Sequence, residues 1–137
     1  MTPQALAALY AAAFPASRGW SAAEFEDLLT SPHCFLVSSK HAFALGRVVA
    51  DEAELLTIAT HPDQQGQGLG RQCLRGFQEE ATSRGATSAF LEVAGDNPAA
   101  INLYESEGWQ RTGLRKGYYA RETGPSVDAV LMGKTLT

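Results

Sequence analysis

The sequence is poor in the residues that build metal sites and disulfides. Its 137 residues include two cysteines and three histidines. Cys34 and Cys73 lack the spacing of metal ligands, and the histidines form no paired motif, so we expect no metal. Both cysteines lie in apolar runs, which favours packing in a core over a disulfide or a reactive thiol.

Basic residues and long apolar runs are also scarce. Lysine and arginine number 11 against 15 aspartate and glutamate residues, which gives a net charge of −4 at pH 7. Because nucleic-acid binding needs clustered cations that neutralise phosphates, we expect no nucleic-acid partner. No apolar run approaches the roughly 18 residues of a membrane span, and no positive residue precedes the apolar opening as in a signal peptide. We therefore expect a cytoplasmic protein without a membrane partner.

The remaining composition is that of a globular protein. Hydrophobic residues make up 45% of the chain and aromatic residues 9%, which is enough to form a core. Chains of this length usually fold around a single core, so residues 1–137 are predicted to form one domain. The sequence leaves the oligomeric state open.

Helix-start signals occur at three places. Thr2 can cap a helix that begins with a proline, and Ser21 with Glu24 three residues later forms a capping box. Asn97 precedes a proline at the first turn of another helix, and a glycine follows that helix. Apolar side chains that recur every four positions predict the longest helix between about residues 68 and 84. Four helices are therefore expected.

Six apolar, β-leaning runs are distributed among these helices. The first three, within residues 33–60, are separated by short polar turns and predict an antiparallel meander. The third of them, the longest helix and the run at 87–93 form a βαβ unit, so these two strands should be parallel neighbours. Two strands within residues 109–136 complete the chain. The pattern predicts a mixed α/β fold.

The segment HPDQQGQGLGRQCL, residues 61–74, places three glycines within five positions at the start of the longest helix. The first amides of a helix have no intrahelical acceptor, and the helix dipole favours negative charge there. Gly66, Gly68 and Gly70 permit positive φ angles and let a bulky anion such as a diphosphate approach the backbone. The pattern indicates phosphate binding, although a tight strand-to-helix turn would use the same glycines.

Two well-known phosphate-binding patterns fit this segment poorly. A P-loop needs a lysine after its second glycine, and no lysine occurs between Lys40 and Lys116. A Rossmann fingerprint needs a third glycine where Arg71 stands, and too little chain follows for a dinucleotide fold, although Glu92 lies at a suitable distance.

Residues 65–70, QGQGLG, match another pattern: glutamine or arginine, two residues, glycine, one residue, then glycine or alanine. This pattern resembles the acetyl-coenzyme A signature of the GCN5-related N-acetyltransferase (GNAT) superfamily. EAELLTIATHP ahead of it, then LEV, Asn97, AAINLYESEGW and GYY, resemble the bacterial ribosomal-protein alanine N-acetyltransferases. The resemblance extends from about Trp20 to the C-terminal strand.

The resemblance implies a GNAT fold. The antiparallel N-terminal meander and a parallel βαβ centre with splayed strands would form one mixed sheet flanked by about four helices. Acetyl-coenzyme A would be the acetyl donor. The cofactor-binding residues that the resemblance implies are Ile58, Ala59 and Thr60 along the pantetheine arm, Gly66, Gln67, Gly68, Leu69, Gly70 and Arg71 around the pyrophosphate, and Asn97 at the arm.

The resemblance also implies the roles in acyl transfer, in which an amine attacks a thioester. Glu92 would be the general base, Tyr104 the general acid, and an amide near Ile58 or Ala59 the donor to the oxyanion. Asn97 and Tyr104 lie two helical turns apart and share a face, and Glu92 lies near the C-terminal end of the predicted central strand. A solvated carboxylate and a core tyrosine are the structural alternatives for Glu92 and Tyr104.

The expected substrate is a primary amine, namely the N-terminal α-amine of a protein such as a ribosomal protein that begins with alanine. An α-amine has a pKa of about 8 and lysine about 10.4, so freeing a lysine amine at neutral pH costs roughly 3 kcal/mol more. Tyr118 and Tyr119 fall where the family frames its peptide channel, although paired aromatics also pack on edge strands. The alternatives are a small-molecule amine and, from another class, a non-catalytic acyl-coenzyme A sensor.

Overall fold

The computed structural model describes residues 1–15, 19–121 and 123–136. The elements of these residues, in chain order, are α1 (Pro3–Ala13), α2 (Ala22–Thr30), β1 (Cys34–Ser38), β2 (Ala42–Val49), β3 (Glu52–Thr60), a 3-10 turn (Pro62–Gln64), α3 (Leu69–Ser83), β4 (Ser88–Ala94), α4 (Pro98–Ser106), β5 (Gln110–Tyr119) and β6 (Val127–Thr135). Every predicted helix and strand is present, and the 3-10 turn is an addition.

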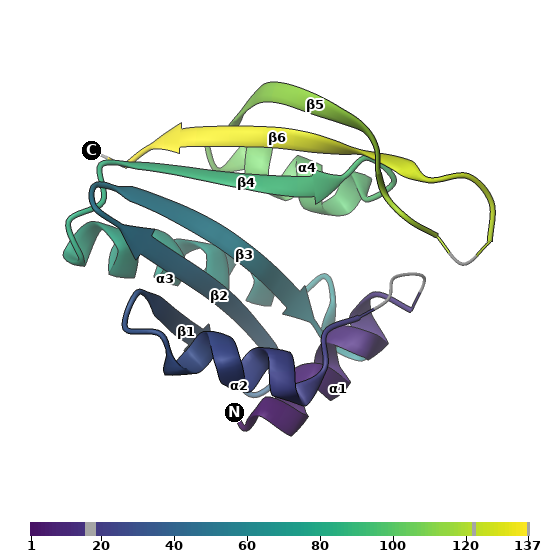
Figure 1. Cartoon of the computed structure of the whole chain (residues 1–137), viewed down its shortest axis with the longest axis horizontal. Coiled ribbons are helices and arrows are strands. Elements are labelled where there is room, and N and C mark those ends of the chain that lie inside the picture. Colours follow the sequence, from purple (N-terminus) through teal and green to yellow (C-terminus); the bar gives the residue numbers. More distant parts are fainter. Residues whose placement is uncertain (16–18, 122, 137) are drawn as a thin grey trace.

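One mixed sheet organises these elements, with the strand order β1-β2-β3-β4-β6-β5 (Figure 1). The first three strands form the predicted antiparallel meander, and β3 pairs with β4 in parallel. β6 then lies between β4 and β5 and is antiparallel to both. Within the described residues, no helix has the length and apolar character that crossing a membrane requires.

Helices cover both faces of the sheet and enclose two hydrophobic cores. α3 and α4 pack on one face, where the larger core includes Leu74, Phe77 and Met132. α1 and α2 pack on the β1–β3 half of the other face, where Phe25 and Phe43 are fully buried in the smaller core. The two cysteines are buried and unbridged, as the sequence predicted.

The predicted capping residues fix the starts of α1, α2 and α4. The Thr2 hydroxyl accepts a hydrogen bond from the Ala5 amide at 3.1 Å. Ser21 and Glu24 form the complete capping box, and Asn97 is the N-cap of α4. Each cap satisfies an amide that the helix itself cannot pair.

β3 and β4 separate halfway along their length. Their parallel register ends at Leu55 and Leu91, although both strands continue beyond these residues. Leu56 is skipped in the register between β3 and β2, which passes from Leu55 to Thr57. A β-bulge of this kind bends its strand and increases the local twist. The bulge therefore turns β3 away from β4, and Figure 1 shows the two strands diverging.

The same bulge changes which face each later residue of β3 occupies. Leu55 and Ile58 both pack against the core under α3 and α4, although they are three residues apart. Ala59 packs instead against the core under α1 and α2. Side chains in a regular strand alternate between faces, so the extra residue shifts this alternation by one position. The end of β3 consequently presents a different set of side chains from the one that simple alternation predicts.

Candidate active site

A cleft of about 530 Å³ opens beside the glycine-rich loop. It is bounded by the last residues of β3, the loop, the first turn of α3, the start of α4 and the end of α1. All the predicted cofactor-binding residues except Gln67 line it. The lining residues are Ala13, Phe14, Pro15, Ile58, Ala59, Thr60, Gln64, Gln65, Gly66, Gly68, Leu69, Gly70, Arg71, Asn97, Ala99, Ala100 and Leu103.

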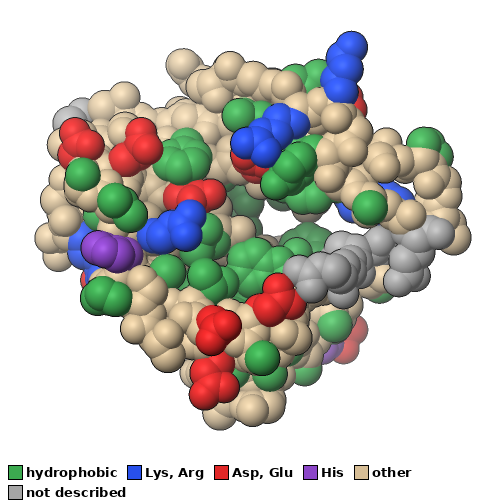
Figure 2. All heavy atoms as spheres, in the orientation of Figure 1, with side chains coloured by type: hydrophobic (Ala, Val, Ile, Leu, Met, Phe, Trp, Pro, Cys, Tyr) green, Lys and Arg blue, Asp and Glu red, His purple; other side chains and the backbone are tan. Residues whose placement is uncertain are grey.

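A smaller cavity of about 130 Å³ lies between the diverging halves of β3 and β4. Glu92 and Tyr104, the two predicted catalytic residues, both line it, together with Tyr119. Phe14, Ile58, Asn97 and Ala100 line this cavity and the larger cleft alike, so the two spaces adjoin. In Figure 2 the molecule is hollowed between its lower part, which carries α1 and α2, and its upper part, with hydrophobic side chains around the hollow.

The two predicted catalytic side chains reach this cavity from opposite faces of the sheet. Leu91 and Val93 of β4 belong to the core under α3 and α4, so strand alternation directs Glu92 to the other face. Tyr104 projects from α4 within that same core. The gap between β3 and β4 therefore brings together a carboxylate and a phenol that a continuous sheet would separate.

Burial changes the acidity of two phenols at this cavity. The side chain of Tyr104 is 4% exposed, and burial, with a smaller contribution from Tyr119, raises its pKa well above the ordinary value. Burial and then the nearby Glu92 carboxylate raise the pKa of Tyr119 to about 12. Desolvation opposes the charged phenolate in both cases. Both hydroxyl groups are therefore protonated at neutral pH and can donate hydrogen bonds.

Glu92 has a cationic partner that the sequence did not reveal. Arg115 Nη2 lies 3.2 Å from Glu92 Oε1, and the Glu92 side chain is 24% exposed. The Arg115 guanidinium also lies over the ring of Tyr118, 4.8 Å from its centroid. Tyr118 itself is 53% exposed and does not line either cavity. Of the two tyrosines predicted to bind the substrate, Tyr119 therefore lines the smaller cavity, whereas Tyr118 lies on the surface.

The glycine-rich loop ends in a helix start without a side-chain cap. Gly66 and Gly68 have φ angles of 83° and 81°, which favour glycine. Gly68 is the N-cap of α3 and, unlike the caps of α1, α2 and α4, supplies no side-chain hydrogen bond. Leu69, Gly70 and Arg71 in the first turn of this helix line the larger cleft. Amides at this position can bind an anion in the cleft.

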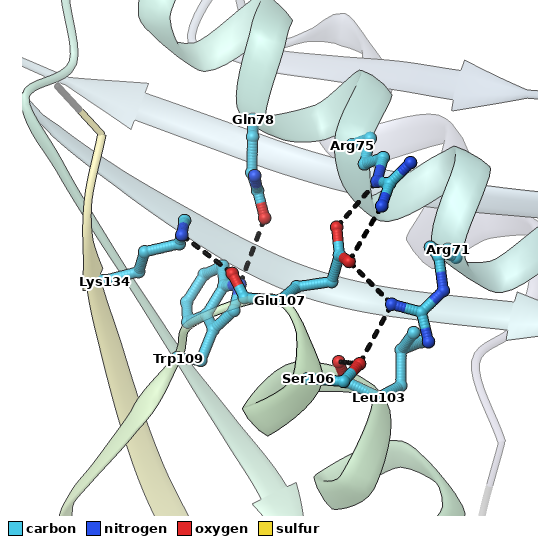
Figure 3. A network of polar contacts seen from close by, with 8 residues as sticks. All are labelled: Arg71, Arg75, Gln78, Leu103, Ser106, Glu107, Trp109 and Lys134. Carbon is cyan, nitrogen blue, oxygen red and sulfur yellow. Dashed lines mark hydrogen bonds and ion pairs between the residues drawn. The ribbon is translucent and has the colours of Figure 1, made fainter.

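The side chain of Arg71 is held by α4 (Figure 3). Its Nη1 donates to Glu107 Oε2 at 2.6 Å and to the Ser106 hydroxyl at 2.9 Å. Arg75 donates two further hydrogen bonds to the same carboxylate, at 2.8 and 3.1 Å. Lys134 Nζ donates to the Glu107 carbonyl oxygen at 2.7 Å. This network ties the first turns of α3 to the end of α4, and no local pattern in the sequence predicts it.

Two aromatic residues, one in α1 and one directly after it, belong to the site and were missed. Tyr10 and the C-cap residue Phe14 continue the apolar face of α1, a pattern typical of core residues, yet both line the cavity between β3 and β4. No sequence signal separates these two uses of an apolar face. No group of three or more histidine, cysteine, aspartate or glutamate side chains that could hold a metal occurs in residues 1–15, 19–121 and 123–136.

Comparisons with known proteins agree with this geometry. Residues 4–109 match the sequence model of the acetyltransferase (GNAT) family. This match begins ahead of Trp20, the residue from which the resemblance was expected to extend. The chain is 46% identical over 91 residues to a [Ribosomal protein bS18]-alanine N-acetyltransferase of Escherichia coli, covering 66% of this chain and 61% of that relative. It is 39% identical over 125 residues to the N-alpha-acetyltransferase RimI of Mycobacterium tuberculosis, covering 85% of this chain and 77% of that relative.

A solved structure agrees over most of the chain. The crystal structure of the ribosomal-protein-S18-alanine N-acetyltransferase from Escherichia coli superposes with a TM-score of 0.81 at 36% identity. The match covers 96% of this chain and 88% of that one. The mixed sheet, the splayed strands and the four helices of the described residues thus form a fold already seen in an acetyltransferase.

The network around Glu107 predicts a specific dependence of stability on pH. The hydrogen bonds from Arg75 and Arg71 lower the pKa of Glu107 from 4.5 to about 2, and its side chain is 10% exposed. The folded chain therefore gains stability above pH 4.5 that is lost as the pH falls toward 2. We expect Glu107→Gln to lower the free energy of unfolding by about 2 kcal/mol at pH 7 and to flatten its fall between pH 4.5 and 2, measured by urea denaturation.

Glu105→Gln is the matched control for this substitution. Glu105 lies in the last turn of α4, two residues ahead of Glu107, and pairs with Arg111 at 3.6 Å, but the two side chains are 45% and 59% exposed. Exposed pairs contribute little to stability, so this variant should follow the wild-type curve. An acid limb as steep in Glu107→Gln as in the wild type would disprove the stabilising role of the Glu107 carboxylate.

Proposed function

The chain belongs to the acetyltransferase (GNAT) family, and on this basis we propose that it transfers an acetyl group from acetyl-coenzyme A to the N-terminal α-amine of a protein, of the ribosomal-protein alanine type. The observation that carries the proposal is the adjoining pair of cavities, one beside the uncapped start of α3 and the other holding Glu92 and Tyr104. The names of the relatives support the same substrate.

The larger cleft fits the shape and charge of acetyl-coenzyme A. The backbone of Gly66 to Arg71 would hold the pyrophosphate, because a helix start without a side-chain cap attracts negative charge. Beyond Leu55, β3 continues without its β4 partner, so Ile58, Ala59 and Thr60 would pair with the extended pantetheine arm as a strand does. Asn97, at the junction of the two cavities, would touch the same arm.

The bound cofactor supplies an activated acetyl thioester, and the residues of the small cavity handle protons around it. Glu92 accepts a proton from the acceptor ammonium, directly or through one water, which leaves a neutral amine. Arg115, 3.2 Å from the Glu92 carboxylate, keeps that side chain at the mouth of the gap. An amide of β3 near Ile58 or Ala59 donates to the oxygen that gains charge during transfer.

Tyr104 acts in this proposal as a hydrogen-bond donor toward the leaving sulfur. A phenol with a pKa of about 10 is already a weaker acid than a thiol near 8.5. Burial raises the pKa of Tyr104 further, so complete proton transfer from its hydroxyl becomes still less favourable. A hydrogen bond stabilises developing negative charge without that cost.

An assay with matched acceptors tests the function. We expect a peptide that begins with alanine to gain one acetyl group at its α-amine, measured by mass spectrometry. The same peptide with a blocked N-terminus and an internal lysine should not react, because a lysine amine is harder to deprotonate. Turnover confined to polyamines would discard the peptide substrate, and calorimetric binding of acetyl-coenzyme A without turnover of any amine would favour a sensor.

Replacing Tyr104 by phenylalanine tests its role. The change removes one hydroxyl from a side chain that is 4% exposed and keeps the ring, so the fold should be retained. We expect kcat to fall about 100-fold, while the Kd for coenzyme A measured by calorimetry stays the same. An unchanged kcat would remove the assigned role of the phenol.

Replacing Glu92 by glutamine tests the proton acceptor. We expect kcat/KM at neutral pH to fall about 100-fold or more, and the pH profile of the remaining rate to differ from that of the wild type. Glu54→Gln is the matched control, because Glu54 is a strand carboxylate paired with Arg47 at 2.6 Å and 27% exposed, outside both cavities. Equal pH profiles for the two variants would point to water or to the substrate itself as the base.

A further inference from the structure

Two polar contacts hold the end of β5 that carries Tyr119. The Gly117 amide donates a hydrogen bond to Asp128 Oδ1 of β6 at 2.9 Å. Two residues after Tyr119, Arg121 forms an ion pair with Asp96 in the turn between β4 and α4. The first contact joins neighbouring strands of one hairpin, whereas the second joins the hairpin to a separate part of the chain.

The pair of Arg121 and Asp96 has the geometry of a specific contact. Arg121 Nε lies 3.0 Å from Asp96 Oδ2, and its Nη2 lies 2.8 Å from Oδ1. Such a bidentate contact fixes the orientation of the two side chains as well as the distance between them. The Arg121 side chain is 13% exposed, although it follows the end of an edge strand. The hydrogen bond to this guanidinium lowers the pKa of Asp96, so the carboxylate is charged at neutral pH.

The position of this pair links the two sides of the candidate active site. On one side, the Arg121 guanidinium lies 5.8 Å from the centre of the Tyr119 ring, and Tyr119 lines the cavity that holds Glu92 and Tyr104. On the other side, Asp96 immediately precedes Asn97, which caps α4 and lines both cavities. A displacement of Tyr119 would therefore change the wall on the side of the acceptor and leave the larger cleft intact.

We propose that Arg121 and Asp96 are positioning residues that hold Tyr119 on the cavity wall and thereby set the affinity for the acceptor amine. The inference rests on the proposed function and adds to it a determinant of acceptor binding outside the reacting groups. Neither side chain lines the cavities, so the pair acts through Tyr119. Small displacements of a positioning group are enough to weaken a substrate complex substantially.

Steady-state kinetics of Arg121→Gln and Asp96→Asn test the proposal. With a hexapeptide that begins with alanine, we expect each variant to raise the KM for the peptide about fivefold or more and to leave the KM for acetyl-coenzyme A unchanged. The double variant should be no worse than either single variant, because both remove the same contact. Arg121→Lys keeps the charge and loses the bidentate geometry, so its KM for the peptide should lie between those of the wild type and Arg121→Gln.

Arg111→Gln is the control for loss of a cation from the same hairpin. Its pair with Glu105 at 3.6 Å is exposed and lies outside both cavities, so both KM values should match the wild type. A purely structural role would lower the melting temperature and the amount of active enzyme and leave the peptide KM of Arg121→Gln unchanged, which would overturn the proposal. Equal rises in both KM values would also overturn it. Wild-type protein that acetylates no amine would instead refute the proposed function, and the acceptor role of the pair with it.

Discussion

The β-bulge at Leu56 ends the pairing of β3 with β4, and the candidate site is built in the space that this creates. A continuous sheet would bury the backbone of both strands and would keep Glu92 and Tyr104 on opposite faces. The separation leaves one edge of β3 available to an extended ligand and lets the two side chains approach a common cavity. The sheet thus gives up hydrogen bonds between two central strands, and the site depends on that loss.

Much of the fold could be predicted from short-range signals. The caps at Thr2, Ser21 and Asn97 each act within three residues of the helix they start, so the sequence contains all the information that their geometry needs. The βαβ unit around the glycine-rich loop was predictable for another reason. Two strands joined through a helix can pair in parallel, because a parallel pair requires a crossover connection. The nine lining residues of the larger cleft that were expected from the family pattern lie within or beside these elements.

The unpredicted parts of the site depend on contacts between distant segments. Arg115 on β5 reaches Glu92 on β4 across the intervening strand β6, and strand order is not encoded by local periodicity. The position of Tyr119 at the cavity, apart from Tyr118, depends on irregular register between β5 and β6. The bulge at Leu56 leaves no composition signal either, since EAELLTIAT reads as one uninterrupted apolar strand.

The contacts at Glu107 have a consequence for the dynamics of the molecule. The end of α4 is attached to α3 through two arginines and to β6 through Lys134, so it cannot fray without breaking bonds to two other elements. Helix ends held in this way open together with their neighbours as one cooperative unit. Tyr104 lies one turn ahead of this anchored end, and its carbonyl oxygen accepts a hydrogen bond from the Glu107 amide, so the contacts that join α3 to α4 also limit movement of the phenol in the cavity wall.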